Sequence, residues 1–247
     1  MAYQKYFTLS FDDGLEQDKK LINLLKKYEL QCTFNLNSGL LGKHCRIGRI
    51  GNIGIKEFDE TDKFHSVLMK NHDHYRIPEN EIKQVYEGFE VASHAYMHEM
   101  LSKIPADQMK KSIDNDIEKL SSIVGYKISG HAYPFGSTSD EVVTYLKEKG
   151  ILYGRKVMAT HSFVMPEDPF RLRPTCSHQD KKGMDLMDDF LVAQPETNDL
   201  MFYMWGHGYE LDFGTEFSSW KHLENIFEKI AGHDDIVYCT NQQIYKK

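Results

Sequence analysis

Two adjacent carboxylates follow a strand-like stretch near the start of the chain. Residues 7–11 alternate apolar and small hydroxyl side chains, and Asp12, Asp13 and Gly14 come directly after them. Neighbouring side chains on a strand point to opposite faces, so the two carboxylates can share a pocket only if the chain bends, as Gly14 permits. Their environments should then differ, which suits two acids with different tasks. The alternative is an ordinary Asp-Asp-Gly surface turn.

Two histidines with the spacing of metal ligands lie at the end of another predicted strand. The chain reads Ser93-His94-Ala95-Tyr96-Met97-His98 directly after the strand-like run 89–93. Histidines four residues apart on a helical turn face the same way, and a carboxylate from another strand would complete a three-ligand site with open positions. We therefore expect one divalent ion to bind here, and zinc is the first choice among such ions. With 12 histidines in the chain, the spacing can also arise by chance on a solvated helix face.

Strand-like and helical segments alternate along the whole chain. Strands are predicted at 7–11, 31–36, 89–93, 130–133, 151–157, 170–174, 200–205 and 236–239. Helices are predicted at 21–28, 105–123, 138–146, 185–191 and 217–230, the third opening with a capping box of Thr138 and Glu141. This alternation predicts an α/β fold, a distorted (β/α) barrel of about seven parallel strands. We expect a single domain, 1–247, with an irregular insertion near 42–80.

Polar residues fall where these predicted strands end. In such a barrel the active site lies at the carboxyl ends of the strands. The residues at or just after these ends are Asp12, Asp13, His94, Tyr133, Arg155 and His207. Trp205 and Tyr209 flank His207 and can form a wall on which a sugar ring stacks. His178 can face the same cleft or solvent.

Composition narrows the class of function. The 247 residues, 40% of them apolar, can bury one sizeable core. A net charge of -7 argues against a nucleic-acid or anionic-membrane partner. No stretch approaches the ~20 apolar residues of a membrane span, and no signal sequence is recognisable, so we expect a cytoplasmic protein. The four cysteines form no Cys-x-x-Cys pair, which favours free thiols over a zinc ribbon.

Four motifs, taken in order, resemble a known family. They are Ser-Phe-Asp-Asp-Gly at 10–14, Ser-His-x-x-x-His at 93–98, Tyr-Pro-Phe-Gly at 133–136, and a late strand that ends in His207. Together they resemble the polysaccharide deacetylases with the NodB-homology domain, which are carbohydrate esterases of the family 4 type. The resemblance covers nearly the whole chain except the 42–80 insertion, and the first two motifs are specific in combination.

The resemblance implies a role for each motif residue. Asp12 would be the general base that activates the attacking water, and His207 the general acid that protonates the leaving group. The ion would be held by Asp13, His94 and His98. The backbone N–H of Phe135 would help to stabilise the oxyanion. A metal ion, a base and an acid around one acyl carbon agree with the physics of hydrolysis.

The chain also departs from the family pattern. Ala132 stands where many members carry an arginine that orients the base, and Ala95 stands where a hydroxyl is usual. Arg155 could supply the missing cation, or it could form a structural salt bridge. No clean match to the family's Asp-x-x-Asp segment, which tunes the acid histidine, occurs between positions 155 and 200.

Three classes of function therefore follow from the sequence. The first is a metal-dependent hydrolase that removes N- or O-linked acetyl groups from a saccharide, with Tyr133, Phe135, Arg155 and Trp205 binding or orienting the substrate. The second is a hydrolase of a small non-sugar amide or imide on the same scaffold. The third is a non-catalytic carbohydrate-binding protein, which would require a lost ligand or base, and the chain has lost neither.

Overall fold

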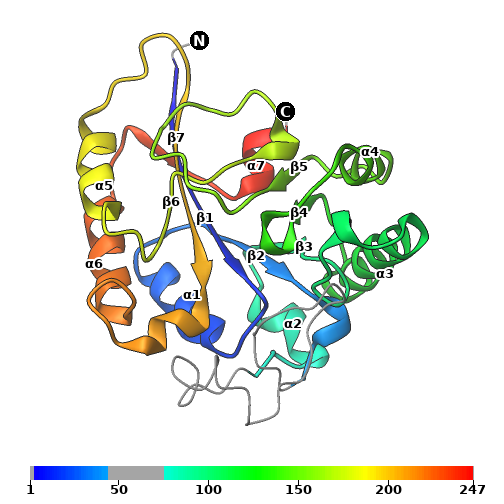
Figure 1. Cartoon of the computed structure of the whole chain (residues 1–247). Helices are drawn as coiled ribbons and strands as arrows, with labels where there is room; N and C mark the ends of the chain where they lie inside the picture. Colours follow the sequence, from blue (N-terminus) through cyan, green and yellow to red (C-terminus); the bar gives the residue numbers. More distant parts are fainter. Residues whose placement is uncertain (1–2, 44–74, 247) are drawn as a thin grey trace.

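A parallel sheet forms the centre of this computed structural model, and helices lie outside it, α5 and α6 on one side and α3 and α4 on the other (Figure 1). The structure describes residues 3–43 and 75–246. The strands are β1 (Lys5–Asp12), β2 (Thr33–Leu36), β3 (Glu90–Ser93), β4 (Gly130–Ala132), β5 (Tyr153–Arg155), β6 (Cys176–Ser177), β7 (Leu200–His207) and β8 (Ile236–Tyr238). The α-helices are α1 (Gln17–Lys27), α2 (Glu79–Val85), α3 (Ala106–Val124), α4 (Asp140–Glu148), α5 (Gly183–Val192), α6 (Trp220–Ile230) and α7 (Asn241–Tyr245).

Seven of the strands follow one another in the order β5-β4-β3-β2-β1-β7-β6, and every neighbouring pair is parallel. The eighth strand, β8, pairs with residues 5–7 of β1, whereas β2 pairs with residues 10–12. The seven strands curl into a half-barrel with β5 and β6 at its edges. The predicted α/β fold, a distorted barrel of about seven parallel strands, is confirmed.

The central strand β1 separates two kinds of interior. Phe7, Leu9 and Phe11 belong to the main hydrophobic cluster, together with apolar residues of the surrounding helices. The alternate residues point into the barrel, where Thr8 donates to Asn241 (2.9 Å) and Ser10 accepts from Asn35 (3.2 Å). This period-two alternation also fixes the direction of the last residue of the strand. Asp12 therefore points into the barrel, at its carboxyl end.

Two helices illustrate how the outer layer forms. In α1 the buried apolar residues are Leu21, Ile22 and Leu25, and in α3 they are Met109, Ile113, Ile117 and Leu120. Both sets recur at three- and four-residue steps, which places them on one helical face. Burying each such side chain stabilises the fold by about 1.5–3 kcal/mol. Gly125 ends α3 in the left-handed conformation (φ 83°), where glycine has no steric cost.

Three local predictions were wrong, and one strand and two α-helices were missed. Residues 170–174 do not form a strand: a 3-10 helix, η4 (Pro169–Arg171), begins there because Asp168 caps it and Pro169 suits a first helical turn. The cap of α4 is Ser139, which accepts from the N–H of Val142 at 3.3 Å, and not Thr138. The third wrong prediction is the helical turn that was expected to carry His94 and His98, and the structure of this segment is described with the site. The missed elements are β6, α2 and α7, of two, seven and five residues.

The described residues leave parts of the sequence predictions untested. The 42–80 insertion lies largely at 44–74, outside the described residues. Cys32, Cys176 and Cys239 are buried free thiols, as expected, and Cys45 lies outside the described range. Among the described residues, no helix has both the length and the apolar character needed to cross a membrane.

Candidate active site

The carboxyl ends of β1 and β7 lie side by side and bring two predicted site residues together. Asp12 and His207 are Cα partners in the register of these two parallel strands. The Nε2 atom of His207 lies 4.0 Å from a carboxylate oxygen of Asp12 and 4.0 Å from one of Asp13. Sheet register alone therefore joins residues that are 195 positions apart in the sequence.

Asp13 turns into the same space because the chain bends at that residue. Its φ is +81° and that of Gly14 is +66°, so the bend begins one residue before the glycine that was expected to allow it. Such a conformation is uncommon outside glycine and marks a strained position. The N–H of Asp13 donates to Asn35 O (2.9 Å), and the side chain lies 3.3 Å from Arg76. The expected sharing of one pocket by two neighbouring acids is present.

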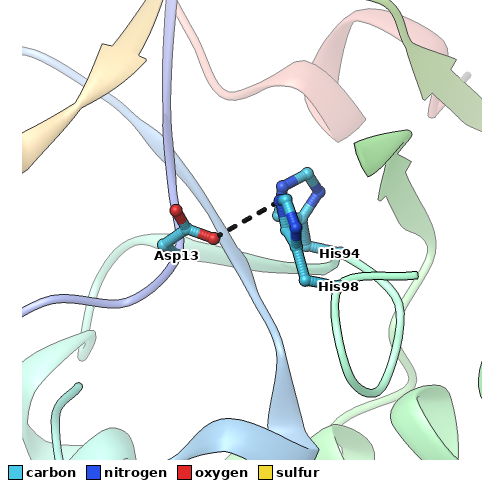
Figure 2. A group of neighbouring side chains, drawn as sticks. All are labelled: Asp13, His94 and His98. Carbon is cyan, nitrogen blue, oxygen red and sulfur yellow. Dashed lines mark ion pairs between the residues drawn. The ribbon is translucent and has the colours of Figure 1, made fainter. Parts of the chain in front are cut away.

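His94 and His98 face Asp13 from an irregular turn, not from the helical turn that was predicted (Figure 2). Ala95 (φ 62°) and His98 (φ 58°) both have left-handed conformations, which break any helical path. Asn37 Nδ2 donates to the carbonyls of His94 and Ala95, and Asp116 accepts the N–H of His94 at 3.1 Å. These polar contacts, in place of helical hydrogen bonds, hold the turn.

Asp13, His94 and His98 form a buried group whose potential ligand atoms all lie within 4.8 Å of one another. The Nδ1 atom of His94 lies 2.8 Å from Ala132 O, which orients the ring so that Nε2 faces the group. The Nε2 atom of His98 lies 3.8 Å from Asp13 Oδ1. Asp13 Oδ2 is buried and has no hydrogen-bond partner among the described residues. One carboxylate and two imidazoles in this arrangement fit a divalent ion.

Electrostatics favours the protonation states that bind a metal ion. Burial lowers the pKa of His98 to about 4 and that of His94 well below its usual range. Burial alone would raise the pKa of Asp13, but His98 and Arg76 outweigh it and lower the pKa. Both imidazoles are therefore neutral and the carboxylate is charged at neutral pH, as metal coordination requires.

Asp12 is held by two other side chains inside the barrel. The Nη2 atom of Arg155 contacts both carboxylate oxygens of Asp12, and Asn35 Nδ2 donates to Oδ1 at 2.8 Å. Arg155 is fully buried and its guanidinium lies over the Trp205 ring, 4.7 Å from the centroid. Ala132 is the Cα partner of Arg155 on the neighbouring strand. Arg155, on the neighbouring strand β5, thus supplies to Asp12 the positive charge that position 132 lacks.

His207 has a carboxylate behind it that the sequence analysis did not identify. Glu210, in the 3-10 helix η5 (Gly208–Phe213), has Oε2 3.3 Å from His207 Nδ1 and 2.9 Å from His178 Nε2. Burial alone would lower the pKa of His207, but the Glu210 carboxylate outweighs it and raises the pKa to about 9. The spacing of three residues between His207 and Glu210 was the available signal.

A cavity of about 230 Å³ opens over this group. Its lining residues are Asp12, His94, His98, Phe135, Val157, Trp205, His207 and Tyr209. Phe135, 40% exposed with φ 58°, packs edge-on against His98 at a centroid distance of 4.6 Å. Tyr133, by contrast, is fully buried, donates to Phe170 O at 2.9 Å, and is not among the lining residues. Of the predicted site residues, Asp13, Tyr133 and Arg155 do not line the cavity, although Asp13 lies next to His98 and Arg155 contacts Asp12.

Known proteins resemble this chain in sequence. A family model described as polysaccharide deacetylase matches residues 2–154. Peptidoglycan-N-acetylmuramic acid deacetylase PdaC of Bacillus subtilis (strain 168) is 25% identical over 146 residues, which are 58% of this chain but only 24% of that protein. The matched region thus spans about a quarter of that relative's length.

Solved structures share the fold. A Mycobacterium smegmatis protein assigned as a polysaccharide deacetylase superposes with a TM-score of 0.62 at 15% identity, covering 100% of this chain and 90% of that one. A mutant of BA3943, described as a family 4 carbohydrate esterase pseudoenzyme with restored enzymatic activity, gives a TM-score of 0.52 at 15% identity and covers 93% and 63%.

Proposed function

Because the chain belongs to the polysaccharide deacetylase family, we propose that it is a metal-dependent hydrolase that removes N- or O-linked acetyl groups from a carbohydrate. The observation that carries the proposal is the buried group of Asp13, His94 and His98. Two of its members line the same cavity as Asp12 and His207. Potential metal ligands, a second carboxylate and a charged imidazole thus meet at one small space.

The three potential ligands leave coordination positions open, as hydrolytic zinc sites do, and zinc is the ion that we propose. When bound, it would supply Lewis-acid chemistry, polarising the acyl carbonyl and lowering the pKa of a nearby water. The orphaned Asp13 Oδ2 and the orientation of the His94 ring support this fit.

Asp12 is the proposed general base. Its carboxylate accepts a proton from the attacking water, whose oxygen forms the new bond to the acyl carbon. Arg155 and Asn35 hold this carboxylate in one orientation, so little reorganisation is needed when the proton arrives. The left-handed Phe135 at the rim of the cavity supports a role for its backbone N–H in stabilising the oxyanion.

His207 is the proposed general acid. When the bond between the acyl carbon and the leaving atom breaks, its electron pair takes the proton from His207 Nε2. A pKa of about 9 keeps this imidazole protonated at neutral pH, so the proton is available. The products are acetate and a free amine or alcohol, and the proton that Asp12 accepted restores the acid in the next cycle.

The walls of the cavity support a carbohydrate substrate. Phe135, Trp205 and Tyr209 present aromatic surface next to the acid and base, and sugar rings offer apolar C–H faces to such rings. The volume of about 230 Å³ lies below the 300–1,000 Å³ of typical ligand sites, so a single acetylated residue fits best. The same small volume favours a small non-sugar amide as the second candidate substrate.

A substrate panel tests the proposal. Purified protein, stripped of metal and then reloaded with zinc, is assayed on acetylated oligosaccharides, acetylated monosaccharides and small amides. Acetate release that depends on zinc supports a deacetylase, and turnover of small amides alone supports the second candidate. His94→Ala and His98→Ala should bind less metal and lose activity. Zinc stoichiometry unchanged in both variants, or no turnover on the panel, would refute the proposal.

A further inference from the structure

Glu210 makes contacts that link His207 to a second, deeply buried histidine. Its Oε2 atom accepts the backbone N–H of His207 at 3.1 Å and forms an ion pair with the Nδ1 atom of the same residue at 3.3 Å, without the geometry of a hydrogen bond. The same oxygen lies 2.9 Å from His178 Nε2. One carboxylate oxygen thus faces two imidazole nitrogens, which is favourable only while the carboxylate is charged.

His178 is buried between the Phe11 ring and the backbone at Gly206. It is 1% exposed, and its ring stacks on Phe11 at a centroid distance of 5.9 Å and an interplanar angle of 21°. A Cβ at Gly206 would lie 1.9 Å from His178 Cδ2, so only glycine fits opposite the ring. His178 can therefore be buried here only if residue 206, which precedes His207, is glycine.

The surroundings of His178 fix which ring nitrogen carries its proton. Its Nδ1 atom is buried without a hydrogen-bond partner among the described residues, whereas Nε2 faces the Glu210 carboxylate. A proton on Nδ1 would be unsatisfied, and a buried unsatisfied donor costs about 1–3 kcal/mol. His178 is therefore a donor to Glu210 through Nε2, and it restricts the carboxylate to one orientation.

We propose that Glu210, oriented by His178, is the positioning residue that directs Nδ1 of His207 to itself and Nε2 to Asp12 and Asp13. The proposal rests on the proposed function, in which His207 Nε2 delivers the proton to the leaving group. In that step the Nε2–H bond breaks, an N–H bond forms on the leaving nitrogen, and His207 keeps its Nδ1 proton against Glu210. Glu210 and His178 do not touch the substrate.

Glu210→Gln separates positioning from helix capping. A glutamine can still accept the backbone N–H of His207, so it keeps the start of η5, but it lacks the charge that attracts the His207 ring. Asp212→Asn is the matched control, because Asp212 is an exposed carboxylate of the same helix that binds Trp220 Nε1 (2.7 Å). His178→Phe keeps the stacking on Phe11 and removes only the donor.

Kinetics with two probes read the effect on catalysis. On tetra-N-acetylchitotetraose, whose leaving amine needs a proton, Glu210→Gln should lower kcat by about 10- to 100-fold with KM within about twofold. On 4-nitrophenyl acetate, whose leaving group needs no proton, the loss should be under about threefold. His178→Phe should show the same pattern to a smaller degree, and Asp212→Asn should behave as the wild type. In a His207→Gln background, Glu210→Gln should add no further loss.

A second readout does not depend on activity. In ¹⁵N spectra of histidine-labelled, metal-free protein, the wild type and Asp212→Asn should show a proton on His207 Nδ1 that Glu210→Gln loses. If zinc-loaded wild type hydrolyses neither probe, the proposed function fails, and the ring signals alone decide the positioning proposal. Unchanged His207 signals in Glu210→Gln, or equal losses on both probes, would overturn it.

Discussion

Moving the buried arginine from position 155 to position 132 tests whether its charge fixes Asp12. Ala132 and Arg155 are Cα partners on neighbouring strands, and such strands lie about 4.8 Å apart. In the strand order β4 is one place nearer to β1, so an arginine at 132 would start closer to Asp12. The variants are Arg155→Ala, Ala132→Arg and the double variant. Only the double variant has both the cation and the space that Arg155 leaves.

The contacts of Asp12 set the expected magnitudes. Removing Arg155 leaves Asn35, on Oδ1, as the remaining hydrogen-bond donor to the buried carboxylate among those described. Breaking a buried charge pair in this way costs about 3–5 kcal/mol of folding free energy. The loss of kcat cannot exceed the 10² to 10⁴ that a general base contributes, and we expect about 10². Ala132→Arg alone adds volume to a packed interior and should cost at least about 1–3 kcal/mol.

Urea unfolding, zinc content and kcat on an acetylated oligosaccharide are measured for all four proteins. The double variant should recover most of the stability and of the kcat that Arg155→Ala loses, while zinc content stays near one per chain throughout. The reasoning is refuted if Arg155→Ala keeps wild-type kcat, or if the double variant is no better than Arg155→Ala.

Three further predictions concern substitutions of buried carboxyl groups. Asp12→Asn should retain zinc but lose about 10² to 10⁴ in kcat, measured beside metal analysis, and loss of the ion would show that the roles of the two acids are exchanged. Asp116→Asn should lower the free energy of unfolding by a few kcal/mol, because the carboxylate accepts four hydrogen bonds, among them those from Ser93 Oγ and His94 N, and zinc titration should show weaker binding. Burial raises the pKa of Glu90 above its ordinary 4.5. Between pH 4.5 and the pKa of the folded state, the folded chain therefore keeps a proton that the unfolded chain has lost, and the free energy of unfolding should fall as the pH rises through this range. Urea unfolding across pH should show this fall in the wild type and not in Glu90→Gln, and parallel curves would contradict it.

The parallel fold and most of the site were predictable because periodicity and topology determine them. Alternation along β1 directs Asp12 inward, and parallel strands place their carboxyl ends on one edge, so His207 meets Asp12 despite their separation in sequence. Arg155 was predictable only as one of two alternatives. Its contact with Asp12 depends on strand order, which the sequence pattern does not specify.

Other features depended on local geometry that residue patterns do not encode. The turn with His94 and His98 is held by Asn37 and Asp116, and its left-handed residues are not glycines, so the spacing predicted a helical turn instead. Glu210 was missed because its approach to His207 depends on a 3-10 turn after a glycine. Elements of two to five residues, such as β6, carry too few positions for a period to show.

The hydrogen bonds at the base of the 44–74 stretch have a consequence for how this protein can be re-engineered. Arg76 N–H donates to Lys43 O (3.0 Å), and Gly42 N–H donates to Ile77 O (3.1 Å), so the backbone closes on itself before entering the stretch. Ile77 N–H in turn donates to Gly14 O (2.9 Å), next to Asp13. We therefore expect changes in length between positions 44 and 74 to leave these hydrogen bonds, and the connections of the sheet, in place.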